Sequence, residues 1–271
     1  MGKLIVFWSP IHGQGGTSAN AAAIASLFSL EQSSHSLLTH TQLTYSPLDS
    51  YYSKEKRAVG FENSGIQALE RKVKSNLLQP EDIPDYTDTI YKRKMDLLIG
   101  SLKENEDSAS DNLRTISRIL YSAKGHYDTV WVDTHAGVHN ETSKTLLEAA
   151  DLVVVCLPQN KYVLERFFTG DYFPSELRNK PYIILISRYE ENSSLTVRNI
   201  KRAHKVKVPI LPVPFSPTYL DAMNNHSVAE FFYRVNRIQN GDPAYSFIRA
   251  IRTVNETVRK ALGLDKEEDG L

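Results

Sequence analysis

The sequence predicts an α/β protein with a doubly wound, mostly parallel sheet. Short apolar runs, mostly of β-branched residues, recur along the chain with helical stretches between them. Several of these runs are apolar throughout instead of alternating with polar residues. Parallel strands show that pattern because helices cover both of their faces. Strands and helices that alternate in this way indicate one sheet with helices packed on both sides.

Apolar runs and helical periodicity place the expected elements along the chain. The expected strands are residues 3–8, 36–40, 96–99, 128–133, 152–157, 182–187 and 209–214. The expected helices are residues 17–30, 64–76, 111–124, 140–149, 194–204 and 243–262. Loops are expected where no period is found and Ser, Tyr, Pro or acidic residues are frequent, at 41–60, 78–90 and 103–111. The apolar spacing of the last helix predicts that it packs on the sheet and not on a membrane.

Length and composition fit a single globular domain. The 271 residues are 41% hydrophobic and 24% charged, which is typical of a folded soluble chain. We expect one domain over residues 1–264 and a disordered tail over residues 265–271. Lysine plus arginine and aspartate plus glutamate each number 32, so the overall charge predicts no strong attraction to nucleic acid or membranes.

The single cysteine bears on the cellular compartment. Cys156 lies in the apolar run 152–157, where a buried thiol is expected instead of a nucleophile. A lone cysteine permits no disulfide within the chain, which fits a reducing compartment. Strand-like sequence starts within the first few residues, so we expect no signal peptide, and no apolar run approaches the roughly 20 residues of a membrane span. These features predict a cytoplasmic protein.

Residues 9–20, SPIHGQGGTSAN, have the context of a phosphate-binding loop because they join an apolar strand to a helix of small residues. In such a loop, backbone N–H groups and a helix N-terminus converge on phosphate oxygens. Gly13, Gly15 and Gly16 give the backbone that freedom, and a Mg²⁺-binding hydroxyl is expected at Thr17. The usual lysine is missing. A hydrogen bond to a charged group contributes about 1.5–3 kcal/mol, so its loss weakens nucleotide binding by about one to two orders of magnitude without abolishing it.

A second motif, VWVDTHAG at residues 130–137, ends another predicted strand with an acid. Asp133 closes the apolar run, and Gly137 follows four residues later. That spacing suits a carboxylate that holds Mg²⁺ through water, next to a backbone sensor of the terminal phosphate. Asp133 is therefore the candidate metal-binding and catalytic acid.

Taken together, the motifs resemble the ParA/MinD-type ATPases with deviant Walker motifs, and especially the TadZ/CpaE-like members that localise pili. The resemblance spans residues 3 to about 230. It rests on the loop at 11–18, the Asp133-Thr134-x-x-Gly137 motif, and the stretches at 153–159, 186–189 and 212–217. It implies a P-loop NTPase fold of the SIMIBI class, with the last two stretches framing the adenine base.

The resemblance also implies a set of ligand contacts. ATP or ADP with Mg²⁺ would be bound by His12, Gly13, Gln14, Gly15, Gly16, Thr17, Ser18, Arg188, Pro214 and Phe215. The metal ion would be held by Thr17 and Asp133, and Asp133 would be the catalytic residue. The family forms a nucleotide-stabilised sandwich dimer, so a homodimer is expected.

Four departures from the family pattern lie at this one site. Ile11 replaces the signature lysine that reaches across the dimer, and Gly16 replaces the lysine of the P-loop. The second strand, with residues 37–42, lacks the acids that orient the attacking water, and Ser187 takes the place of a base-reading asparagine. Hydrolysis needs both charge stabilisation and a positioned water. The Walker A loop is therefore degenerate, and we expect weak or absent ATP hydrolysis.

These observations favour a positioning or assembly scaffold that responds to nucleotide and serves a pilus, secretion or partition system. One alternative is an active ATPase that uses His12, Gln14 and Arg188 in place of the lysines. Another is a DNA-partition protein that contacts DNA through a basic cluster, although a solvated helix face is the favoured interpretation of that cluster. The cluster comprises Arg198, Lys201, Arg202, Lys205 and Lys207.

Two features of the site have competing interpretations. The glycine-rich loop could be a purely structural turn, although retained ATP or ADP binding is favoured. His12, His40 and His135 fall at predicted strand ends on the ligand side. Their spacing matches no local metal motif, so polar rim residues or phosphate contacts are favoured over a metal site.

Overall fold

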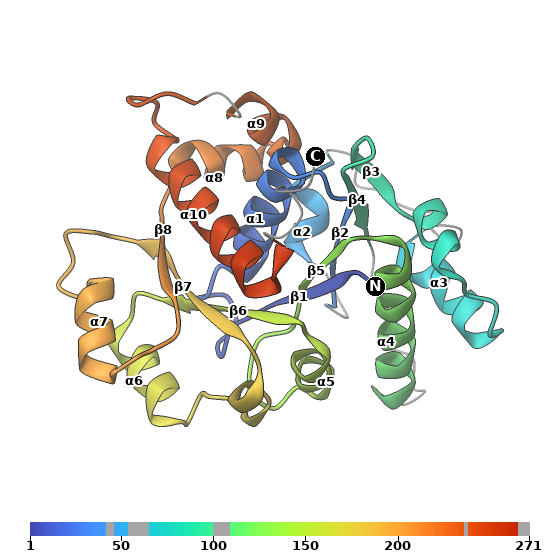
Figure 1. Cartoon of the computed structure of the whole chain (residues 1–271), viewed down its shortest axis with the longest axis horizontal. Helices are drawn as coiled ribbons and strands as arrows, with labels where there is room; N and C mark the ends of the chain where they lie inside the picture. Colours follow the sequence, from blue (N-terminus) through green and yellow to red (C-terminus); the bar gives the residue numbers. More distant parts are fainter. Residues whose placement is uncertain (42–45, 54–64, 100–108, 236–237, 265–271) are drawn as a thin grey trace.

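The computed structural model describes residues 1–41, 46–53, 65–99, 109–235 and 238–264. Eight strands form one sheet, in the order β3-β4-β2-β5-β1-β6-β7-β8 (Figure 1). Every neighbouring pair is parallel except β3 and β4. The predicted fold class, a doubly wound and mostly parallel sheet, is confirmed. The expected tail at 265–271 lies outside the described residues, as do most of the loop expected at 41–60 and the residues 103–108.

The strands lie close to their predicted places, with one addition. They are β1 (Lys3–Trp8), β2 (Ser36–His40), β3 (Asp88–Tyr91), β4 (Met95–Leu98), β5 (Thr129–Asp133), β6 (Leu152–Pro158), β7 (Tyr182–Tyr189) and β8 (Ile210–Pro214). The loop expected at 78–90 was wrong at its end, because β3 begins there. This short edge strand pairs antiparallel with β4 and remains partly exposed, so it lacks the apolar run that marks the central strands.

The helices include four short ones that periodicity did not reveal. They are α1 (Thr17–Glu31), α2 (Pro47–Ser50), α3 (Gly65–Lys74), α4 (Ala109–His126), α5 (Glu141–Ala149), α6 (Lys161–Thr169), α7 (Val197–His204), α8 (Pro217–Asn224), α9 (Val228–Val235) and α10 (Tyr245–Leu262), with 3₁₀ turns η2 (Pro80–Tyr86) and η3 (Ser175–Asn179). The missed ones are α2, α6, α8 and α9. Three of them begin at side-chain caps, Ser46, Asn160 and Ser216, which are the signals that could have found them.

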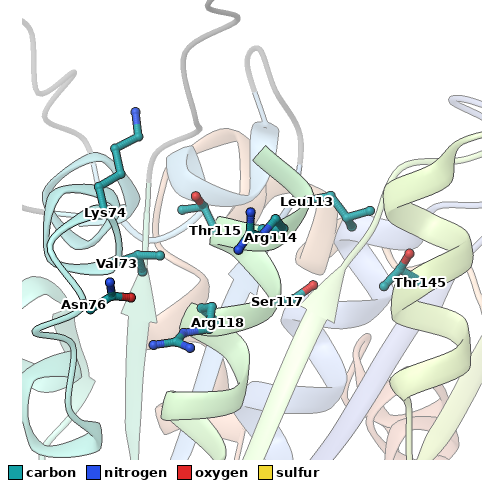
Figure 2. A pocket seen from close by; sticks show the side chains of 9 residues that line it. All are labelled: Val73, Lys74, Asn76, Leu113, Arg114, Thr115, Ser117, Arg118 and Thr145. Atoms are coloured by element: carbon teal, nitrogen blue, oxygen red, sulfur yellow. The ribbon is translucent and has the colours of Figure 1, made fainter. Parts of the chain in front are cut away.

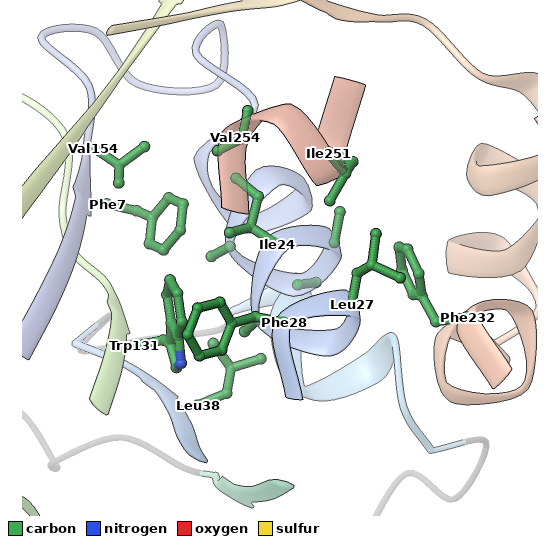
Figure 3. Packing of buried hydrophobic residues seen from close by; sticks show 14 of the residues in the cluster. Phe7, Ile24, Leu27, Phe28, Leu38, Trp131, Val154, Phe232, Ile251 and Val254 are labelled. Atoms are coloured by element: carbon green, nitrogen blue, oxygen red, sulfur yellow. The ribbon is translucent and has the colours of Figure 1, made fainter. Parts of the chain in front are cut away.

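Two apolar layers hold the helices against the sheet. On one face, Phe7 and Trp131 of the sheet pack against Ile24 and Phe28 of α1, and Ile251 of α10 joins the same cluster (Figure 3). The Phe28 and Trp131 rings meet edge to face with 5.0 Å between centroids. The C-terminal helix packs directly on the sheet against β8 and also against α1, as its spacing predicts. The other face is covered by α3 to α7 and holds a second cluster.

Strand register brings the site residues to one edge of the sheet. In the paired strands, Phe7 of β1 and His40 of β2 both lie beside Asp133 of β5. The loop after β1 therefore starts next to the acid that ends β5. Ligands of open α/β sheets bind at this carboxyl edge, which makes it the candidate ligand site. In the described part of the chain, no helix has the length and apolar character needed to cross a membrane.

Candidate functional site

The loop between β1 and α1 depends on two glycines for different reasons. A Cβ atom added to Gly15 would lie 2.7 Å from the backbone oxygen of Cys156 and 2.4 Å from Ser9 Oγ. No L side chain fits there without displacing the backbone. Gly16 caps α1 with φ of 62°, in the left-handed region that favours glycine. The loop is therefore shaped by close approach at Gly15 and by conformation at Gly16.

The loop presents a run of available backbone donors. Within the described chain, the N–H groups of residues 13–19 make no hydrogen bond to the backbone or to a side-chain cap. The first turn of α1 also contains no acidic residue. Unpaired N–H groups and the positive end of a helix dipole together favour an anion. The local geometry thus suits a phosphate group at the start of α1.

The other side of this loop is fastened to the end of β7. The Ser187 hydroxyl donates to the carbonyl oxygen of Gly15 at 2.6 Å and accepts from the Asn20 amide at 2.8 Å. The Arg188 guanidinium donates to the carbonyl oxygen of Gln14 at 3.2 Å. Arg188 has a left-handed backbone, with φ of 49°, at the point where the register between β7 and β8 shifts. This bulge aims its side chain at the loop.

Asp133 is buried beside the start of α1 with half of its carboxylate unpaired. Its side chain accepts a short hydrogen bond from the Ser18 hydroxyl through Oδ2, while Oδ1 has no partner among the described residues. Burial raises the pKa of Asp133 to about 6, against the lowering effects of the Ser18 hydrogen bond and of His40. Such an orphaned buried oxygen is a strong acceptor for a cation or its water ligands.

An acid from α2 joins this side of the site. His40 ends β2 almost fully buried, and its Nε2 lies 3.2 Å from Oδ2 of Asp49. The negative charge of Asp49 contributes to the raised pKa of Asp133, so the two carboxylates lie within electrostatic range of each other. Asp49 was missed because it lies in the stretch expected to be a loop. Its signal was the Ser46-Pro47 start of a helix.

The remaining predicted contacts in this loop region occupy different positions. His12, Gly13 and Gln14 are exposed at the loop tip, and Thr17 is half-buried beside Ser18. His135 is also half-buried, and its pKa is lowered first by burial and then by the charges of His12 and His40. The three imidazoles thus lie within electrostatic range of one another, but His40 is almost fully buried and is not the rim residue that was expected. The described residues contain no group of three or more metal-ligating side chains of histidine, cysteine or acidic type.

The loop after β5 is fastened to the loop after β1. The N–H of Gly137 donates to the backbone oxygen of Ser9 at 2.9 Å, and Trp8 Nε1 donates to the oxygen of Gly137 at 3.1 Å. The Gly137 donor, expected to sense a terminal phosphate, is therefore engaged within the protein. A rearrangement of this loop would be needed to free it.

A separate cavity is lined by several of the residues that were expected to frame the adenine base. A volume of about 610 Å³ lies between the end of β7, the end of β8 and the start of α10. Pro214 and Phe215 line it together with Tyr189, Tyr245 and Arg249. Arg188, which directly precedes Tyr189, does not line this cavity. Its side chain instead contacts the glycine-rich loop at the carbonyl oxygen of Gln14. The end of β7 thus connects the two parts of the site.

A larger cavity of about 740 Å³ lies elsewhere, between α3, α4 and α5 (Figure 2). Arg114 and Arg118 of α4 line it, together with Lys74 at the end of α3 and Asn76 just after that helix. None of its lining residues belongs to the loop or carries a carboxylate. Its size is therefore no reason to prefer it over the carboxyl edge, where the chemistry is gathered.

The basic cluster of α7 lies on the surface. Arg198, Lys201 and Arg202 are exposed, as are Lys205 and Lys207 after the helix. The contact seen for Arg202 is to Asn199 of its own helix at 3.4 Å.

The sheet order and the central strand–glycine loop–helix unit define a P-loop NTPase fold of the ParA/MinD type. A ParA family ATPase from Chlorobium tepidum has this fold, with a TM-score of 0.69 and 18% identity over 92% of this chain and 97% of that one. A putative plasmid partition protein from Borrelia burgdorferi bound to AMPPNP has a TM-score of 0.66 and 20% identity, over 96% and 99%. The septum site-determining protein MinD from Pyrococcus horikoshii, complexed with Mg-ADP, also has 0.66, at 14% identity over 96% and 99%.

At these identities the likeness establishes the fold alone. No protein-family model matches the sequence, and no curated protein has detectable similarity to it. The activity of the site must therefore be argued from its own residues.

Proposed function

We propose that this chain is a cytoplasmic nucleotide-binding protein of ParA/MinD type that holds ATP or ADP with Mg²⁺ and hydrolyses ATP weakly or not at all. One observation carries the proposal: unpaired N–H donors of residues 13–19 lie at the start of α1, beside the unpaired Oδ1 of buried Asp133. The donors suit phosphate oxygens, and the carboxylate suits a hydrated divalent cation. A purely structural turn would leave both features without a partner.

The residues present fit the metal and the nucleotide. Mg²⁺ takes oxygen ligands, and hydroxyls of Thr17 or Ser18 with the Asp133 carboxylate would supply them. The bound ion would stabilise charge on the phosphates. Pro214 and Phe215 would face the base from the cavity at the end of β8. Arg188 would contact the loop from the side of β7, through the carbonyl oxygen of Gln14.

The same geometry supports weak hydrolysis. Gly16 places no cation at the phosphates, and its left-handed backbone differs from that of an ordinary helical residue. The N–H of Gly137 is engaged by Ser9. The charge of a P-loop lysine and a free N–H to sense the terminal phosphate are thus both missing, and both contribute strongly to phosphoryl transfer.

Without efficient hydrolysis, the protein would act as a scaffold and not as a cycling switch. We propose a nucleotide-stabilised homodimer with facing loops, as in TadZ/CpaE-like members, that recruits proteins of a pilus, secretion or partition system. The exposure of His12, Gly13 and Gln14 at the loop tip supports contact with a second chain.

The deciding experiment titrates the protein with a fluorescent ATP analogue and Mg²⁺ while light scattering follows its mass. Saturable binding that weakens when EDTA removes Mg²⁺, with a shift from monomer to dimer, would support the proposal. No binding at millimolar analogue would overturn it. Binding without a mass change would retain nucleotide recognition and reject the dimer.

A second candidate, an active ATPase, is favoured by the His40–Asp49 pair beside Asp133. These groups could position a water despite the missing acids of β2. His12, Gln14 and Arg188 would then replace the lysines. Phosphate release that disappears in Asp133→Ala would support this candidate, and none at any Mg²⁺ concentration would reject it.

The exposed cations of α7 favour a third candidate, DNA binding during partition. Each phosphate contact adds about −0.9 to the slope of log affinity against log salt on duplex DNA. Retention on DNA that falls with salt, and that is lost when Arg198, Lys201 and Arg202 are changed to alanine, would support it. Absence of binding at low salt would reject it.

A further inference from the structure

The direction of two peptide groups in the loop can be read from their carbonyls. A trans peptide is planar, so its C=O and N–H point in opposite directions. The oxygens of Gln14 and Gly15 both point at the end of β7, where Arg188 and Ser187 donate to them. The N–H groups of the same two peptides, those of Gly15 and Gly16, therefore point away from β7.

The group that holds these carbonyls is itself held in place. Ser187 is almost fully buried, and it connects Asn20 of α1 to the Gly15 carbonyl through two hydrogen bonds. Arg188 occupies a left-handed conformation that costs an arginine free energy, so it persists only because the surroundings impose it. The register shift after Ser187 is what turns the Arg188 side chain toward the loop.

From this arrangement we infer that Ser187 and Arg188 are positioning residues for a polyphosphate. They fix the N–H groups of Gly15 and Gly16 toward the anion. The charge of Arg188 also makes the Gly15 N–H a stronger donor, because it acts through the Gln14–Gly15 peptide. A hydrogen bond accepted by a carbonyl polarises its peptide and makes the attached N–H a better donor. The loop would thus gain through the peptide part of the positive charge that a lysine at position 16 would have supplied. The inference rests on the proposed nucleotide binding.

The first test needs no nucleotide. The ¹H–¹⁵N resonances of Gly15 and Gly16 are compared in the wild type and in Arg188→Asn, since asparagine tolerates the left-handed backbone and removes the charge. We expect the Gly15 amide to move while Gly16 stays near its wild-type position, and Ser187→Ala to move Gly16 more. Arg188→Lys should restore part of the Gly15 shift. Arg234→Asn, at an exposed site on α9, is the control. An unchanged Gly15 amide in Arg188→Asn would overturn the inference.

The second test compares adenosine, AMP, ADP and ATP as ligands of the same variants. We expect Arg188→Asn to weaken ATP and ADP by roughly three- to tenfold and to leave adenosine unchanged, with partial recovery in Arg188→Lys. Equal losses for all four ligands would place Arg188 at the base and overturn the inference, as would no loss at all. Failure of the wild type to bind any of them would reject the proposed function. The amide shifts would still decide whether Ser187 and Arg188 orient the loop.

Discussion

The two halves of the site offer different chemical groups. The loop half, residues 12–19, offers backbone N–H groups, and its tip from His12 to Gln14 is exposed. The acidic half, Asp133 with His40 and Asp49, offers side chains, and both His40 and Asp133 are only 1% exposed. A site made of peptide groups depends on glycines and on the direction of carbonyls, so it survives the loss of charged side chains. A site made of buried carboxylates depends on charge balance and responds to pH.

The strongest way to break the loop half is Gly15→Ala. The new methyl would lie within 3 Å of a backbone oxygen and of Ser9, and a backbone atom cannot rotate away. We expect the free energy of unfolding to fall by about 3 kcal/mol or more. Nucleotide binding should be lost at temperatures where the variant remains folded. Thermal unfolding and analogue titration measure the two effects.

Gly13→Ala is the matched control for Gly15→Ala. Gly13 has φ of 73° but nothing within 4 Å of an added Cβ, so it pays conformational strain without a clash. A loss of about 1 kcal/mol is expected. If the two variants were equally destabilised, close packing at Gly15 would not be what shapes the loop.

The acidic half is tested by Asp133→Asn. The raised pKa of Asp133, to about 6, means that the folded state disfavours the charged carboxylate. The stability that this group contributes is fully present below about pH 4, and it is lost as the pH rises through about 6. The asparagine removes a penalty of about 3 kcal/mol at most, so the variant should be more stable than the wild type at pH 8 and equal to it at pH 4.

Magnesium gives the same variant a second readout. A cation at the unpaired oxygen of Asp133 would offset the cost of the buried charge. Mg²⁺ with nucleotide should therefore raise the melting temperature of the wild type at pH 8 and have little effect on Asp133→Asn. A variant that is less stable than the wild type at pH 8 would show that the carboxylate is structural.

The same contrast explains how far the sequence alone could predict the molecule. The central strands and the glycine loop were predictable because burial on both faces leaves apolar runs, and Asp133 ends one of them. The edge strand β3 was not, because its partly exposed residues carry no such run. The Ser187–Asn20 contact was hidden for another reason: it joins residues 167 positions apart, and no local pattern reports such a meeting. Asp49 lies only nine positions from His40, and its local signal was the Ser46-Pro47 start of a helix.

Gly16→Lys returns the missing lysine to the loop half. An added Cβ would meet Ser187 at an ordinary 3.6 Å, so the cost is conformational and not steric. With φ of 62°, a lysine should lower the free energy of unfolding by about 1 kcal/mol. Gly16→Asn, which tolerates this conformation better, should cost less. We expect no gain in phosphate release, and a clear gain would show that lysine rebuilds the loop.

The smallest expected effect is that of Asp49→Asn, which tests whether the acidic half behaves as one electrostatic unit. The charge of Asp49 helps to raise the pKa of Asp133, although burial is the larger cause. Its removal should shift the titration of Asp133 to lower pH by less than the whole displacement, because burial remains. Carboxyl ¹³C resonances followed across pH measure this shift directly. An exposed acid such as Glu191 serves as the control, since Glu191→Gln should leave the titration of Asp133 unchanged. A shift to higher pH in Asp49→Asn would mean that the loss of the His40 partner outweighs the lost repulsion, and the pair would then act on Asp133 through His40 instead of through charge.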